Sequence, residues 1–208
     1  KLKKHNSNIT YFGNVCDYEH FSKSLTTHID NIPLDIKRIS KPIVGFIGSI
    51  SEYKLDYKLI HDVANNLQEI NFVFIGPTDD SLQHSNLNKI KKLKNVFLLG
   101  YRKYKYLPSY CAYFDVAWLP LIHNNYTKSM FPMKFFEYLA AGLPVVSTDL
   151  ESIREYGKLV AVSDDISKIK ISIIEALKNK NSNLKNRLSL AMENTYQKRT
   201  KKMLMELN

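Results

Sequence analysis

Residues 43–77 read IVGFIGSISEYKLDYKLIHDVANNLQEINFVFIGP, and this stretch carries the clearest indication of the fold class. It opens on IVGFIG, a short run rich in β-branched residues, and closes on a second such run, FVFIGP. Between the two runs, apolar side chains recur at helical spacing, at Leu59, Ile60, Val63, Leu67 and Ile70. Strands that are apolar on both faces are typical of a parallel sheet with helices on both sides. The stretch therefore predicts a strand–helix–strand unit.

The same alternation continues toward the carboxyl terminus. Four more short apolar runs predict strands at residues 95–100 (NVFLLG), 115–120 (DVAWLP), 144–148 (PVVST) and 158–163 (KLVAVS). Helical patterns fall between the strands, at residues 87–93, 105–113, around Glu137, near Ile153 and at 166–177. The sequence therefore predicts an α/β fold, a Rossmann-like doubly wound parallel sheet of about six strands.

The pattern divides the chain into three parts. Residues 41–180 are predicted to form the Rossmann-like domain, and residues 181–208 to form basic amphipathic helices. Residues 1–40 break the alternation with polar runs and Pro33, so we expect a linker or the end of a preceding domain there. The chain begins at Lys1 without an initiator Met or a signal-peptide pattern, which suggests a fragment of a longer protein.

Composition narrows the class of protein. The 208 residues are 44% hydrophobic and 24% charged, as in an ordinary soluble globular protein. Cys16 and Cys111 are far apart, which favours a reducing, cytoplasmic setting. The six histidines show no metal-ligand spacing, so we expect no structural metal. The longest apolar run, residues 138–146, is far too short to span a membrane.

The formal net charge is +10, and basic residues cluster in short runs. These runs are KLKK at 1–4, KIKKLK at 89–94, RKYK at 102–105 and KRTKK at 198–202. Such runs attract anions, namely nucleic acid, acidic lipid headgroups or phosphate-bearing ligands, although an ordinary solvated surface explains any single run equally well. No nucleic-acid-binding motif accompanies them, so no nucleic-acid partner is predicted.

The fold itself indicates where a ligand would bind. In an open parallel sheet, ligands bind beyond the carboxyl ends of the strands. Three of the loops at that edge begin with glycine, at Gly48, Gly76 and Gly100. Glycine there permits a ligand to approach the backbone closely, although glycine also simply ends strands.

The most informative loop leads into FPMKFFEYLAAGLPVV, residues 131–146. Pro132 suits the first turn of a helix, and the free amides of that turn favour an anion. Lys134 opposes the helix dipole there, which a bound diphosphate would explain. Glu137 lies on the same face, and its carboxylate could accept two hydrogen bonds from a ribose diol. From spacing alone, an ordinary Lys134–Glu137 ion pair is the somewhat stronger interpretation.

YLAAGLPVVST after Pro-x-Lys-x-x-Glu resembles the donor-binding motif of nucleotide-sugar glycosyltransferases with the GT-B fold, in the retaining, bacterial polysaccharide-type group called group 1 or family 4. VGFIGSISEYKLDYKLI, NFVFIGP and NVFLLGYRKYKYLPSYCAYFDVAWLPL resemble further strands and loops of the carboxyl-terminal domain, in the same order. ITYFGNVCDYEHF resembles the linker that enters this domain. The resemblance extends roughly over residues 9–177.

The resemblance implies a donor site for a nucleoside-diphosphate sugar and a hexosyltransferase-like activity without a metal cofactor. Glu137 would hold the ribose, and Lys134, the amides near Met133 and Lys54 would bind the diphosphate. The remaining members of the implied site are Gly48, Ser49, Tyr101, Arg102 and Ser129, of which Tyr101 and Arg102 would line the base pocket. No catalytic residue is assigned. The acceptor, a polysaccharide or a lipid-linked sugar, would bind a missing amino-terminal domain, so this chain alone would transfer little.

The sequence departs from the family at informative positions. Only Asn14 and Asp17 match the linker motif. Ser129 stands where the family has the first glutamate of its Glu-x7-Glu motif, and Ser49 where it commonly has arginine. The missing first glutamate leaves open a binding module without chemistry. A nucleotide-sugar 2-epimerase also stays open, because such enzymes share the GT-B architecture and bind the same ligands, although the linker and the strand pattern favour a transferase. The basic tail also suggests peripheral contact with anionic lipid at the inner face of the membrane, unless its apolar residues pack on the other domain.

Overall fold

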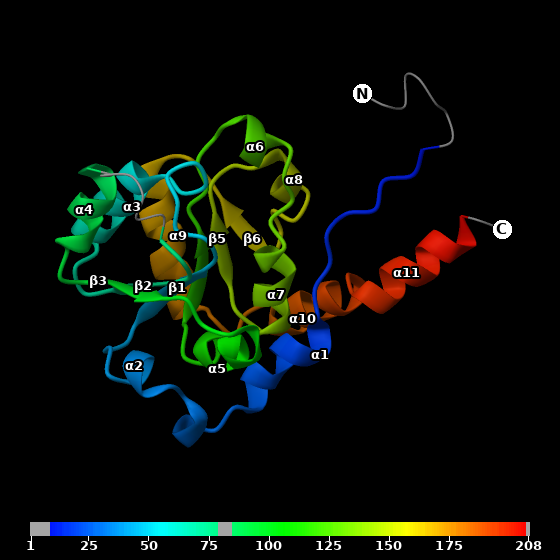
Figure 1. Ribbon diagram of the computed structural model, residues 1–208, viewed down its shortest axis with the longest axis horizontal. Coiled ribbons are helices and arrows are strands. Elements are labelled where there is room, and N and C mark those ends of the chain that lie inside the picture. Colours follow the sequence, from blue (N-terminus) through cyan, green and yellow to red (C-terminus); the bar gives the residue numbers. More distant parts are fainter. Residues whose placement is uncertain (1–8, 79–84, 207–208) are drawn as a thin grey trace.

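The computed structural model describes residues 9–78 and 85–206 and has a parallel sheet at its centre (Figure 1). Its six strands lie in the order β3-β2-β1-β4-β5-β6, which confirms the predicted doubly wound topology. The strands are β1 (Ile43–Ile47), β2 (Asn71–Ile75), β3 (Val96–Gly100), β4 (Val116–Leu119), β5 (Val145–Ser147) and β6 (Val160–Val162). Every residue of β1, β4 and β5 is buried, because helices cover both faces of the sheet.

The helices form one layer on each side of the sheet. On one face α3 (Tyr57–Asn66) packs against α4 (Ser85–Lys91) and α9 (Ile166–Lys178). On the other face α7 (Lys134–Ala140) packs against α1 (Tyr18–Phe21) and α10 (Leu184–Glu193), and α5 (Leu107–Cys111) packs against α1. The short helix α8 (Glu151–Arg154) follows β5, as the sequence predicted near Ile153.

The segment before β1 folds onto the second face. It contains α1, the 3₁₀ helices η2 (Ser22–Thr26) and η3 (Ile29–Asn31), and α2 (Leu34–Lys37). Phe21, Ile32 and Ile36 from this segment are buried in the same hydrophobic cluster as the strands. The described part of the predicted linker, residues 9–40, therefore contributes directly to the core of the domain.

Two predicted elements differ in detail. The dozen-residue loop after β4 contains a short helix, α6 (Asn125–Lys128), because Asn124 and Thr127 form a capping box at its start. The helix predicted at 105–113 begins as the 3₁₀ helix η4 (Tyr104–Tyr106) and continues as α5. The helical tail is two helices, α10 and α11 (Tyr196–Met205), because Thr195 caps a new helix.

The ends of the described chain run together on one side of the molecule (Figure 1). Cys16 forms a parallel bridge with Thr195, between α10 and α11. Further along, the Thr10 hydroxyl donates to Glu206 at 3.0 Å, and Arg199 donates to the Gly13 carbonyl at 3.5 Å. Residues 10–16 therefore lie alongside α11, which projects from the body of the domain.

Candidate functional site

The centre of the sheet opens at its carboxyl edge. β1 pairs with β4 only at Val44↔Val116 and Gly45↔Ala117, and the two strands then separate. The Ile47 N–H donates instead to the hydroxyl of Tyr138, at 2.7 Å. This opening is the topological switch point, where the chain crosses from the β1–β2–β3 side of the sheet to the β4–β5–β6 side. Open α/β sheets bind their ligands at this point.

A cavity of about 280 Å³ lies above the opening. Its walls come from the end of β1 and the following loop, from β4 and its long loop, and from the start of α7. The lining residues are Asn14, Phe46, Ile47, Gly48, Ser49, Lys54, Leu119, Leu121, Tyr126, Met130, Phe131, Pro132, Met133 and Lys134. The structure thus brings five of the candidate residues to one cavity: Gly48, Ser49, Lys54, Met133 and Lys134.

Asn14 and Tyr126 line the cavity, although the sequence analysis gave neither of them a site role. Asn14 reaches the cavity from the segment before β1, and its side chain donates to the Phe131 carbonyl at 2.8 Å. Its match to the family linker motif was the available signal. Tyr126 lies on α6, inside a stretch that the sequence predicted only as loop, and nothing in its local pattern marked it.

Lys134 and Glu137 form an ion pair within α7. Lys134 lines the cavity, whereas Glu137 does not, and only 3% of Glu137 is exposed. Burial raises the pKa of Glu137, and the neighbouring Lys134 ammonium offsets part of this rise. The Lys134 ammonium also lies 5.4 Å from the Phe21 ring centre and 5.9 Å from that of Tyr104. The structure therefore contains the Lys134–Glu137 ion pair that the spacing alone favoured. Glu137 is buried and does not lie at the rim of a cleft.

The other candidates lie outside the cavity lining. Tyr101 follows β3 and is 67% exposed. The Arg102 guanidinium pairs with Asp35, at 2.5 Å, and donates to the Tyr110 hydroxyl at 2.7 Å. Although burial opposes it, hydrogen bonding from Arg102 and Tyr110 lowers the pKa of Asp35. The Arg102 side chain therefore ties α2 to the domain. Ser129 is exposed at the end of α6.

The strand-end glycines have structural explanations. A Cβ at Gly76 would lie 1.8 Å from the Gly48 carbonyl oxygen, because the ends of β1 and β2 pass very close to each other. Gly100 has a φ of +73°, which side-chain-bearing residues rarely adopt. The loop predicted after β2, residues 76–80, is described only as far as Thr78. The glycines at the ends of β2 and β3 therefore need no ligand to account for them.

The described part of the chain contains neither a cluster of metal ligands nor a helix suited to span a membrane. Among residues 9–78 and 85–206, no group of three or more His, Cys, Asp or Glu side chains is placed to hold a metal ion. No helix within the same ranges has the length and apolar character needed to cross a membrane.

Comparison with known proteins agrees with this geometry. The sequence profile of the family described as "Glycosyl transferases group 1" matches residues 41–179. A Bacillus subtilis protein named "Putative teichuronic acid biosynthesis glycosyltransferase TuaH" is 35% identical over 116 residues. The match covers 56% of this chain and 29% of that protein.

Solved structures share the fold at low sequence identity. Anabaena Alr3699/HepE in complex with UDP and glucose has a TM-score of 0.73 at 16% identity, over 93% of this chain and 55% of that one. TarM has a TM-score of 0.63 at 17% identity, over 80% of this chain and 35% of TarM. The α,α-trehalose 6-phosphate synthase of Burkholderia multivorans has a TM-score of 0.72 at 12% identity, over 95% of this chain and 50% of that one. The chain thus spans about half the length of HepE or less than a third of TuaH.

Proposed function

Because this chain belongs to the group 1 glycosyl transferases, we propose that it is the donor-binding domain of an enzyme that moves a sugar from a nucleoside-diphosphate sugar to a polysaccharide or lipid-linked acceptor. The observation that carries this proposal is the cavity at the switch point, which is lined both by Lys54 from the loop after β1 and by Lys134 at the start of α7. Two ammonium groups suit a diphosphate, because they stabilise its charge both in the donor and in the departing nucleotide. The UDP bound to HepE and the name of TuaH support this substrate class.

The proposal gives each candidate residue a role. Lys54, Lys134, the first amides of α7 near Met133 and the backbone of Gly48 and Ser49 bind the diphosphate, without a metal ion. When the Lys134 ammonium turns toward the diphosphate, the ion pair with Glu137 is broken. The Glu137 carboxylate then accepts hydrogen bonds from the ribose hydroxyls. Binding of the phosphates and of the ribose is coupled through this ion pair.

The base and the sugar of the donor extend from the diphosphate in different directions. The base lies near the backbone of Tyr101 and Arg102, beyond β3, and the sugar lies toward Ser129, beyond β4. The acceptor and the groups that assist the chemistry belong to an amino-terminal domain of the full-length protein. The domain described here binds the donor and transfers little by itself.

Calorimetric titration with nucleoside diphosphates and their sugar conjugates tests the proposal. The wild type should bind at least one such pair, and Lys54→Ala should weaken that binding by about tenfold or more, because a charged hydrogen bond is lost. Lys58→Ala is the matched control, since Lys58 is exposed on α3 and pairs with Asp62. The proposal fails if no nucleoside diphosphate or conjugate binds, or if the two variants behave alike.

A chelator tests the absence of a metal cofactor. Lysines and amides neutralise the diphosphate in this proposal, so the donor affinity should be the same in buffer with and without EDTA. If EDTA abolishes binding and added divalent cation restores it, the metal-free account is wrong.

A location at the inner face of the cytoplasmic membrane fits a lipid-linked acceptor. Helix α11 supports a peripheral contact, because Lys201 and Lys202 are exposed there together with Met203, Leu204 and Met205. Basic side chains next to exposed apolar ones suit the surface of an anionic bilayer.

A further inference from the structure

The loops that follow β1 and β4 are joined into one wall of the cavity. Leu55 forms an antiparallel bridge with Leu121. The Ile122 N–H donates to the Lys54 carbonyl, and the Asp56 N–H donates to the Pro120 carbonyl, each at 2.9 Å. These three contacts hold the two loops in a fixed relation, although 66 residues separate Leu55 from Leu121 in the sequence.

Two tyrosines lie side by side here: Tyr126 lines the cavity, and Tyr53 contacts it from just outside the lining. The Tyr53 and Tyr126 ring centres are 5.8 Å apart, and the ring planes meet at 73°. The Lys54 ammonium lies 5.8 Å from each ring centre. Tyr126 and Lys54 both line the cavity. Tyr53 is nevertheless 53% exposed and Tyr126 49% exposed, so neither ring is there mainly to fill the core.

The backbone beneath both rings is firmly held. The Asn124 side chain accepts from the Tyr126 and Thr127 amides and donates to the Tyr53 carbonyl, the last at 2.7 Å. Thr127 is buried and completes the capping box of α6. Rigid tyrosines offer a large amphipathic contact area with little loss of conformational freedom on binding.

From this geometry we propose that Tyr53 and Tyr126 bind the sugar ring of the donor. The inference rests on the proposed function, since Lys54, whose ammonium lies 5.8 Å from both ring centres, then holds the diphosphate to which that sugar is attached. One face of a pyranose is rich in C–H groups and packs on an aromatic face, while its hydroxyls reach water or the tyrosine O–H groups. The tyrosines therefore recognise the sugar and not the nucleotide.

The test compares a nucleotide with its own sugar conjugate. UDP and UDP-glucose are the first pair, followed by the GDP and dTDP pairs, and the pair that the wild type binds most tightly is used for the variants. Tyr53→Ala and Tyr126→Ala should each weaken binding of the conjugate by about threefold to tenfold and leave that of the free nucleotide unchanged. Tyr126→Phe keeps the ring and should retain most of the affinity.

Tyr106→Ala is the matched control, because Tyr106 is also 49% exposed but lies on η4, outside the cavity lining. Thermal unfolding of each variant checks that the domain is intact. The inference is overturned if both alanine variants bind the conjugate like the wild type, if free nucleotide and conjugate weaken equally, or if Tyr106→Ala has the same effect. If the wild type binds neither member of any pair, the proposed function itself is refuted. If the wild type binds and the alanine variants bind with the same affinity, only the role of the two tyrosines in binding the sugar is refuted.

Discussion

The Glu137 carboxylate has two alternative partners, the Lys134 ammonium and the ribose of the proposed donor. In the structure it pairs with Lys134 inside the domain, whereas the proposed donor complex needs it for the ribose. Glu137→Ala should therefore weaken binding of a nucleoside-diphosphate sugar by about 1–3 kcal/mol, because a charged acceptor is lost. Titration calorimetry measures this, with Glu175→Ala on the opposite layer as the control. Unchanged affinity together with a lower melting temperature would assign Glu137 a purely structural role.

The same residue predicts a pH dependence of stability. Burial raises the pKa of Glu137 despite the Lys134 ion pair. A carboxyl whose pKa is raised on folding stabilises the fold fully only below its unfolded pKa, and this contribution is lost as the pH rises through its folded pKa. The free energy of unfolding of the wild type should thus fall relative to that of Glu137→Gln as the pH rises above about 4.5, the ordinary value for the group.

Urea unfolding at several pH values between about 4 and 8 checks this prediction. Glu151→Gln is the control, because Glu151 is exposed on α8, and its difference from the wild type should be nearly flat. An opposite slope for Glu137→Gln would mean that the ion pair with Lys134 outweighs burial.

Tyr138 supports the opening between β1 and β4. Its hydroxyl is the acceptor for the Ile47 N–H at the point where β4 no longer pairs with β1. Tyr138→Phe leaves that buried N–H without its acceptor, so the free energy of unfolding should fall by about 1–3 kcal/mol. Chemical denaturation compares it with Tyr106→Phe, which changes an exposed ring on η4. Equal stability of both variants would contradict the role given to the hydroxyl.

At the scale of elements, the position of α7 depends on both of its ends. Pro132 precedes its first turn, and Gly142 ends it with a φ of +79°. The Gly142 N–H donates to the Leu139 carbonyl and the Leu143 N–H to the Tyr138 carbonyl, which is a Schellman motif. The Gly-Leu-Pro break in the sequence thus fixes where the helix that carries Lys134 ends.

Helix α10 fastens that end of α7 through a buried arginine. Arg187 is 2% exposed, and its guanidinium donates to the carbonyls of Gly142, Lys180 and Ser182. Its pKa is lowered by burial alone. Arg187→Met removes the donors for three carbonyls and should lower the free energy of unfolding by about 2 kcal/mol or more. Lys185→Met, at an exposed position of the same helix, should change it by less than about 0.5 kcal/mol.

The two variants are compared by urea denaturation. If Arg187→Met is as stable as the wild type, the carbonyls find other partners, and Arg187 does not hold the end of α7 in place.

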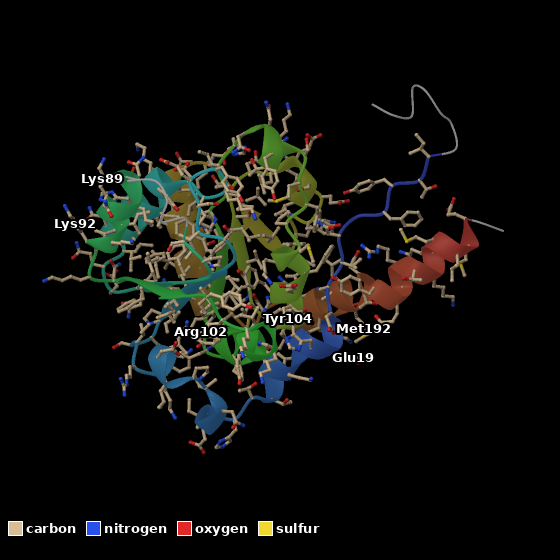
Figure 2. All side chains as sticks on the ribbon, viewed as in Figure 1. Glu19, Lys89, Lys92, Arg102, Tyr104 and Met192 are labelled. Carbon is tan, nitrogen blue, oxygen red and sulfur yellow. The ribbon has the colours of Figure 1, made fainter. Side chains whose placement is uncertain are left out.

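At the scale of the whole molecule, the basic runs do not form one patch. Lys89 on α4 and Lys92, just after that helix, point outward at one end of the longest axis, and α11 projects at the other end (Figure 2). The KLKK run at residues 1–4 lies outside the described residues. A flat anionic surface can therefore engage only part of the +10 net charge at once.

Sedimentation with vesicles of mixed neutral and anionic lipid tests the contact proposed for α11. The chain should be captured at low salt and released near about 0.5 M salt, because the Debye length falls to a few ångströms. Lys201→Glu with Lys202→Glu should reduce capture, at roughly 1 kcal/mol per basic residue. Lys89→Glu with Lys92→Glu changes the charge equally at the other end and should have less effect.

Three results would refute the proposed electrostatic contact between α11 and an anionic membrane. These are no capture by anionic vesicles, equal capture by purely neutral vesicles, and an equal effect of the two double variants. The apolar side chains of α11 would then be assigned to contacts with another part of the full-length protein.

The amino-acid sequence was sufficient to predict the order of strands and helices along the chain, the doubly wound class and the edge of the sheet where the candidate cavity lies. It could do so because apolar periodicity and strand-end glycines are local properties, and the direction of parallel strands sets which loops share an edge. The motif around Lys134 and Glu137 was also readable, because all its members lie within one helix and its flanks.

Only the tertiary structure decided which charged and aromatic groups meet. Arg102 finds Asp35 across 67 residues, Tyr53 meets Tyr126, and Glu137 is buried beside Lys134. Such pairings depend on atomic distances between segments that pack together, and on how far packing excludes water. No local pattern encodes either quantity. From the sequence, Glu137 could therefore bind a ribose or form an ion pair with Lys134, and in the folded structure its carboxylate forms the ion pair.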